Sequence, residues 1–308
     1  MRAGSRIVTV VERAERWIYR PGTARHLAAL RVGLCLVLAA RLSRPLYLQL
    51  AGQPRALFRP VSFMHLLPSM PPAGLVLTIQ VAAVMAALLA AGGIAARVTL
   101  PAAWLGAVFL NGMWTSVGKI MHNDTLLILA LVPLLVAPVA DAWRVTGRRP
   151  DRRAEGPSVR YGWPVRTAMI VVAGGYFFTG LAKVVFSGPA WVLSDNLRWV
   201  MFGVSDQGQH PIGAALLLAG HPLLAHAVAA AALLAELTFP VALWKPAAGW
   251  ILVPAVVLLH AGIGLTMHLD YSAWALTTVV VFVPWDAVAE RRTRGRVRPV
   301  TDAVAVPG

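Results

Sequence analysis

Long apolar runs constrain this chain more than any other sequence feature. Eight runs approach the roughly 20 residues that a helix needs to cross a bilayer; they lie at residues 27–43, 73–92, 98–117, 123–140, 165–188, 222–244, 247–268 and 271–288. Because lipid offers no partners to backbone N–H and C=O groups, each run is predicted to be a helix. Only 13% of the 308 residues are charged, against about 25% in average soluble domains. We therefore predict an all-α, polytopic membrane helical bundle with about eight transmembrane helices.

The arginines predict the orientation of this bundle. Three basic segments hold six, six and five arginines, at residues 1–26, 141–164 and 289–308 respectively. With eight crossings all three lie on one side, and an excess of Lys and Arg marks the cytoplasmic side. The predicted order is a basic cytoplasmic segment (1–26), a transmembrane domain (27–288) and a basic cytoplasmic tail (289–308), so that the chain is N-in and C-in. The linker 141–164 divides the transmembrane domain into two four-helix halves.

The basic segments also bear on partners and location. The net charge of +15 is explained by membrane topology and by contact with anionic lipid headgroups, so we expect the lipid bilayer as a partner and no nucleic acid. The leader has no small-residue cleavage site, which predicts that the first apolar run is retained. We expect a multi-pass protein of the plasma membrane, with the bacterial inner membrane as the favoured host.

Lys183 is the sharpest functional candidate, because an ionisable residue inside a membrane span is costly. It lies about 7 Å from the predicted outer end of run 165–188, at about 1.5 Å per residue. Its amine can snorkel to the outer interface. Alternatively, desolvation disfavours the ammonium form and leaves a neutral amine that can accept a proton.

Further polar residues fall in the same outer half of the predicted bilayer. They are His122, Asn123, Asp124, His260 and His268. The structural interpretation makes His260 a core residue bonded to a carbonyl and makes Asn123 or Asp124 a helix cap. The functional interpretation places the group around one polar pocket with Lys183. Two histidines eight residues apart on one helix cannot chelate one ion, and no metal site is predicted.

Glu236 is the only acidic residue well inside a predicted span. Counted along the helix at about 1.5 Å per residue, its depth differs from that of Lys183 by more than about 10 Å. Arg31, in the first run, lies nearer to Glu236 in depth. We therefore predict a structural ion pair between Arg31 and Glu236.

Two stretches carry a resemblance to a known family. One is Tyr176–Lys183, followed by Trp191; the other is His122–Leu127, continuing to Asp141–Trp143. Together with the order of the runs, they resemble the integral-membrane domain of the vitamin K-dependent γ-glutamyl carboxylase, the HTTM family, over residues 20–290.

The resemblance implies a chemistry for the pocket. Lys183 would match the lysine that deprotonates the hydroquinone of reduced vitamin K, so a reduced quinone is the implied cofactor and a lipophilic small molecule the implied ligand. The candidate substrate-binding residues are His122, Asn123, Asp124, Tyr176, Trp191, His260 and His268. The chain ends soon after its last run, where the carboxylase has a large lumenal domain, and Asp124 stands where the family has histidine. We therefore expect quinol-dependent oxidation or epoxidation, with Lys183 as the base, and no protein carboxylation.

Two other functions remain open on the sequence. A transporter, or a maturation or export factor for a secreted peptide, is favoured by signs of broken helices, since transporters bind substrates at such breaks. The short apolar piece 212–219 and Pro240 in the sixth run are such signs. The other alternative is a membrane partner subunit without chemistry of its own.

Overall fold

The computed structural model describes residues 11–119, 121–145, 156–207 and 213–288. Within these ranges the chain forms helices and no β-strand, which confirms the predicted all-α fold. Residues 1–10 of the predicted N-terminal segment, 146–155 of the predicted linker and the whole of the predicted tail 289–308 lie outside the described residues.

The helices follow the predicted apolar runs, with shorter pieces between them. The longer ones are α2 (Ala24–Leu42), α4 (Ala73–Ala91), α5 (Ala96–Thr115), α6 (Thr125–Leu135), α7 (Val159–Ser187), α9 (Asn196–Gln207), α11 (Pro222–Thr238), α13 (Pro246–Met267) and α14 (Ser272–Phe282). The shorter ones are α3 (Leu46–Leu50), η1 (Arg55–Leu57), η2 (Ser62–Leu66), α8 (Ala190–Leu193), α10 (Gly213–Gly220) and α12 (Val241–Trp244).

Three of the described helices are by themselves long and apolar enough to cross a membrane, namely α4, α7 and α13. A fourth span results if α10 and α11, which meet at an angle of 105°, are counted together. The last predicted run is interrupted after Phe282, because Val283 is extended ahead of Pro284 and proline disfavours a helical residue before it; residues 285–288 are helical again. These helices are those of a multi-pass membrane protein.

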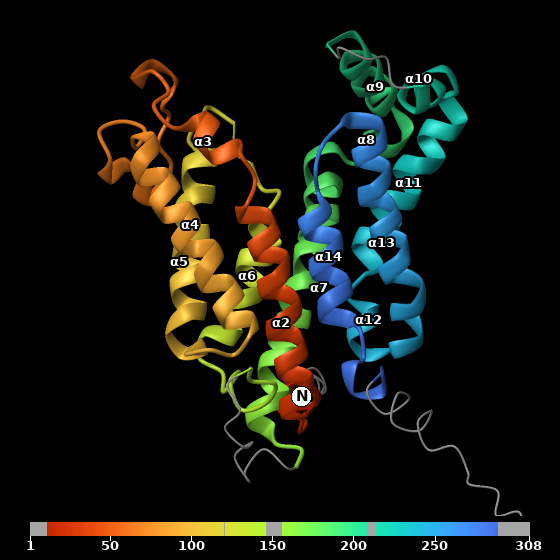
Figure 1. Cartoon of the computed structure of the whole chain (residues 1–308). Coiled ribbons are helices and arrows are strands. Elements are labelled where there is room, and N and C mark those ends of the chain that lie inside the picture. The colour runs from red at the N-terminus through yellow and green to blue at the C-terminus, as the bar shows by residue number, and fades with distance from the viewer. Residues whose placement is uncertain (1–10, 120, 146–155, 208–212, 289–308) are drawn as a thin grey trace, which may run out of the picture.

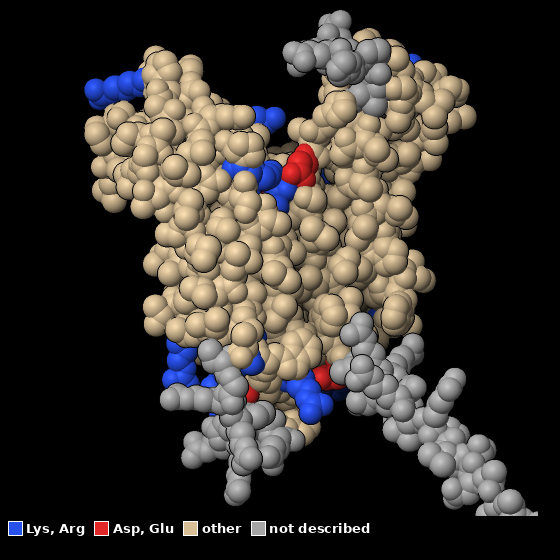
Figure 2. All heavy atoms as spheres, in the orientation of Figure 1, with Lys and Arg blue, Asp and Glu red and all other residues tan. Residues whose placement is uncertain are grey.

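The helices stand side by side in two groups that meet along α7 and α14 (Figure 1). Helices α2, α4, α5 and α6 form one group, and α8 to α13 form the other. The last helix, α14, contacts α2, α6 and α7, so the end of the chain packs against its beginning. Charged side chains on the face in Figure 2 gather at the two ends of the molecule, and the belt between them is uncharged, as a lipid-facing surface requires.

Small residues bring helices close together, both within the first group and between it and α14. A Cβ atom added at Gly106 of α5 would lie 2.5 Å from the Cβ of Ala83 on α4, and one added at Gly33 would lie 2.6 Å from Val280 on α14. Such close backbone approach is the usual basis of helix packing in membranes, where lipid tails are as apolar as the side chains.

Arg31 is fully buried at the N-terminal end of this group. Its guanidinium donates to four backbone oxygens: Val139 at 2.5 Å, Trp143 at 2.6 Å, Ala91 at 3.1 Å and Ala142 at 3.2 Å. Ala91 is the last residue of α4, where carbonyls lack helical partners and the helix dipole favours a cation. Arg31 therefore ties α2 to the end of α4 and to the segment after α6.

Candidate functional site

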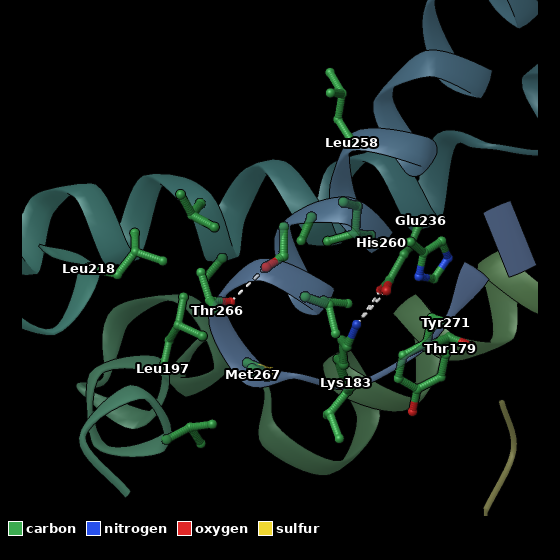
Figure 3. Close-up of a pocket in the computed structure, with 18 of the residues that line it drawn as sticks. Thr179, Lys183, Leu197, Leu218, Glu236, Leu258, His260, Thr266, Met267 and Tyr271 are labelled. Carbon is green, nitrogen blue, oxygen red and sulfur yellow. Dashed lines mark hydrogen bonds and ion pairs between the residues drawn. The ribbon is translucent and has the colours of Figure 1, made fainter. Parts of the chain in front are cut away.

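A cavity of about 480 Å³ lies among α7, α9, α10, α11 and α13 (Figure 3). Most of its lining is apolar, supplied by side chains such as Leu197, Leu218, Leu258 and Met267. Polar side chains gather in one part of the wall, where Figure 3 shows Lys183 and Glu236 joined, with His260 and Tyr271 beside them. A cavity of this size with few convergent polar groups is the usual form of a small-molecule site.

Lys183 and Glu236 form an ion pair in the cavity wall. The Lys183 Nζ lies 2.5 Å from Oε1 and 2.6 Å from Oε2 of Glu236. The lysine side chain is 19% exposed and the glutamate side chain 6% exposed, so the lysine is the more open of the two. The ring of Trp191 lies below the amine, 5.0 Å from Nζ to the ring centroid, where it favours a cation.

A glycine makes this pair possible. Lys183 lies one turn after Gly180 on α7, and a Cβ atom at Gly180 would lie 3.0 Å from the Cβ of Glu236 on α11. Without a side chain at position 180, α7 and α11 approach closely enough for the lysine to reach the carboxylate. The amine therefore binds a carboxylate in the cavity wall. Neither sequence interpretation, the snorkelling amine or the neutral amine, included this carboxylate.

The predicted ion pair between Arg31 and Glu236 is wrong. Glu236 binds Lys183, and the guanidinium of Arg31 binds backbone carbonyls at the N-terminal end of the bundle. The prediction rested on depth along straight runs, whereas α10 and α11 meet at 105° and α11 ends at Thr238. The membrane depth counted from the sequence therefore did not predict which residues on different helices meet.

A hydrogen-bonded chain behind the cavity determines the tautomer of His260. The Thr278 hydroxyl donates to the carbonyl of Trp274 at 2.8 Å, so it accepts from the Tyr176 hydroxyl at 3.0 Å. Tyr176 has then used its only hydrogen, so it accepts from Nε2–H of His260 at 3.1 Å. Nδ1 of His260 is left as an acceptor, buried and without a partner among the described residues.

His122 belongs to the same wall. Its Nε2 lies 2.8 Å from the Tyr271 hydroxyl, and its carbonyl accepts from Nε1 of Trp274 at 3.0 Å. The rings of Tyr271 and His260 stack, 5.7 Å apart at an interplanar angle of 25°. Four of the candidate binding residues therefore line the cavity with Lys183: His122, Tyr176, Trp191 and His260.

The other three candidates do not line this cavity. His268 ends α13 in a left-handed conformation, with φ of 52°, and lines a neighbouring groove. Asn123 donates from Nδ2 to the carbonyl of Asp270 at 2.8 Å. Asp124 stands at the N-cap of α6, as the structural interpretation held, but its side chain makes no cap hydrogen bond and turns to arginines instead.

Asp124 belongs to a separate cluster of charges at the end of the bundle opposite the N-terminus. This cluster, which we term the polar latch, consists of Arg41, Arg44, Tyr47, Asp124 and Asp270. Nε of Arg41 lies 2.5 Å and Nη2 of Arg44 lies 3.0 Å from the Asp124 carboxylate, and both arginines also bind Asp270. The polar latch therefore ties α2 and α6 to the loop between α13 and α14.

The polar latch makes the stability of the fold depend on pH. Burial alone would raise the pKa of Asp270, but the hydroxyl and amide of Ser272 and the charge of Arg41 outweigh it and lower this pKa from 3.8 to about 2. A lowered pKa in the folded state stabilises the protein fully above 3.8, and that stabilisation is lost as the pH falls towards about 2.

Asp270→Asn is therefore expected to lower the Tm of the detergent-solubilised protein at neutral pH, because it removes a charge that the arginines bind. The difference from the wild type should shrink as the pH falls from about 4 to about 2, because the carboxyl of Asp270 then takes up a proton and becomes neutral, as asparagine is. Thermal unfolding curves at a series of pH values measure this. A difference that stays constant over the range would show that the charge of Asp270 is not what stabilises the loop.

The sequence reasoning missed the role of Glu236 beside Lys183. A signal was present, because an unpaired acid and an unpaired base inside spans tend to find each other, but the depth estimate overrode it. Within the described ranges no three His, Cys, Asp or Glu side chains form a group that could hold a metal ion.

Comparisons with known proteins return no match: no family model, no curated protein and no solved structure matches the chain.

Proposed function

We propose that this protein crosses the plasma membrane of a bacterium eight times, with both ends in the cytoplasm, and binds a lipophilic quinol in the cavity beside Lys183. The distribution of arginines supports the orientation. In this arrangement four spans are α4, α7, α13 and the bent pair of α10 and α11, which are long and apolar enough to cross a membrane. The other four are α2, α5, α6 and α14. The polar wall of the cavity then lies in the outer half of the bilayer.

The single observation that carries the ligand proposal is an ion pair in the wall of a mostly apolar cavity. The apolar lining suits the ring and tail of a reduced quinone of the vitamin K hydroquinone type, because burial of apolar surface drives its entry. The Lys183–Glu236 pair suits the hydroxyl group, because its oxygens and N–H groups can accept and donate hydrogen bonds. The likeness of Tyr176–Lys183 and Trp191 to the HTTM family supports the same choice.

Lys183 and Glu236 together provide a route for a proton. The ammonium of Lys183 gives a proton to the carboxylate of Glu236, across a contact of 2.5 Å that needs no movement. The neutral amine that results accepts the proton of the ligand hydroxyl, which makes Lys183 the base and Glu236 the group that prepares it. By the family resemblance, a bound quinol would supply electrons to O₂: one oxygen atom enters the quinone epoxide, and the other leaves as water with the two quinol hydrogens.

The test is binding and consumption of a short-tailed naphthoquinol by the purified protein. Binding is measured under argon by quenching of tryptophan fluorescence, since Trp191 and Trp274 line the cavity, and consumption is measured after O₂ is admitted. We expect saturable binding and O₂-dependent formation of the epoxide.

A matched pair of neighbours on α11 locates the binding. Ala232 lines the cavity and Ala231 is exposed on the other face of the helix. Ala232→Leu fills part of the cavity and is expected to weaken binding about tenfold or more, whereas Ala231→Leu should bind as the wild type does. Wild-type protein that does not bind the quinol, or equal binding by both variants, would refute the proposal for this cavity.

The angle of 105° between α10 and α11 favours a second candidate, a transporter or export factor, because broken helices form the substrate sites of many transporters. Uptake or release of a solute by proteoliposomes that persists in Lys183→Ala, without quinol consumption by the wild type, would support that function instead.

A further inference from the structure

A second groove lies on the other side of α13 from the cavity. It has a volume of about 480 Å³ and runs between α13 and α14, where it is lined by Val257, Ala261, Gly264, Ala275 and Leu276, among others. Leu276 is 47% exposed, and Leu265 on α13 is also exposed. In a membrane protein this surface faces the acyl chains, so the groove opens towards lipid.

The groove and the cavity share three lining residues. His260, Leu269 and Tyr271 line both of them. His260 and Tyr271 stack upon each other, and Leu269 lies in the short loop that joins α13 to α14. The groove and the cavity therefore meet at these three residues.

Two glycines in the last two turns of α13, Gly262 and Gly264, leave space on both sides of this wall. A Cβ atom added at Gly262, on the cavity side, would meet no atom within 4 Å. One added at Gly264, on the groove side, would meet only the carbonyl oxygen of Leu269, at 3.8 Å. A glycine in a helix interior costs about 1 kcal/mol relative to alanine, so two within three residues weaken α13 where the groove and the cavity meet.

We propose that the groove between α13 and α14 is the site at which a lipophilic ligand enters the cavity from the membrane, and that His260, Leu269 and Tyr271 form its gate. This inference rests on the proposed function, because it needs a ligand that binds in the cavity. Apolar amphiphiles with one small polar head are the class that the groove admits, since its lining is apolar along the helices and carries His268, Asp270 and Ser272 at the end where a head would lie. Rotation of the Leu269 and Tyr271 side chains opens the gate.

Two glycine variants separate entry from binding. Gly264→Leu fills the groove and leaves the cavity unchanged, so it should slow association and dissociation of the short-tailed naphthoquinol by the same factor, about tenfold, at an unchanged Kd. Gly262→Leu projects into the cavity, so it should weaken the Kd about tenfold or more. Both variants replace a helical glycine by a good helix former, which favours folding. Stopped-flow fluorescence quenching on protein in lipid nanodiscs measures both rates.

The outcomes distinguish the gate from the function on which it rests. Suppose that Gly264→Leu binds and releases the quinol at wild-type rates while Gly262→Leu binds it more weakly. The ligand would then enter elsewhere, which would overturn the gate but not the binding site. Wild-type protein without binding would overturn both proposals. If Gly264→Leu does not fold, Ala275→Phe fills the same groove from α14 and should give the same slowing.

Discussion

Lys183→Met is expected to lower the rate of quinol consumption by about 10²- to 10⁴-fold, the usual effect of losing a positioned general base. Methionine keeps the length of the side chain and its apolar contacts with the cavity, but cannot accept or give a proton. Binding of the quinol should change much less than the rate, because most of the lining that holds the apolar part of the ligand is untouched. The measurement is epoxide formation per protein under saturating quinol, together with the Kd under argon.

The control for this variant is a second substitution in the pair. Removing one partner of a buried ion pair costs about 3–5 kcal/mol, because the other charge remains buried alone, and Glu236 is only 6% exposed. Replacing both partners by apolar residues of similar size is often neutral. Lys183→Met/Glu236→Leu should therefore regain the Tm that Lys183→Met loses, yet remain inactive. Activity that returns with the fold, or full activity in either variant, would exclude the lysine as the base.

Arg31→Met is expected to destabilise the protein by at least about 3 kcal/mol, since hydrogen bonds to charged groups are each worth about 1.5–3 kcal/mol and buried acceptors are left unsatisfied. The guanidinium is fully buried and binds four carbonyls, so methionine leaves all four without the donor that they have in the wild type. The loss should appear as a lower Tm in detergent and as a lower yield of folded protein.

Arg25→Met is the matched control on the same helix. Arg25 is exposed and lies in the first turn of α2, and its side chain makes no hydrogen bond to the described residues. Its loss should change the Tm little, within about 0.5 kcal/mol as is usual for surface substitutions. Arg31→Lys should fall between the two, because a single ammonium carries three donors in a different geometry. Equal stability of Arg25→Met and Arg31→Met would show that the buried network contributes nothing.

The sequence by itself determined the fold class and pointed to some of the polar residues in the cavity wall. Apolar runs without charge have few alternatives to helices, and the helices lie within a few residues of the runs. One of the two interpretations of the sequence placed His122 and His260 around a pocket with Lys183, the family resemblance added Tyr176 and Trp191, and all five line the cavity. An ionisable or aromatic polar residue in an apolar run has to turn inward, and a bundle of few helices has few places to put it.

The tertiary structure alone decided which charges meet. Whether Glu236 binds Arg31 or Lys183 depends on how close two helices come and how each is rotated, and that is set by contacts such as Gly180 against Glu236. Likewise, the sequence placed Asp124 near a pocket, whereas packing turned it to Arg41 and Arg44. The hydrophobic pattern of a sequence indicates which residues are buried, but it does not contain the distance between two helices. Which polar residues pair inside the membrane therefore depends on how the helices pack.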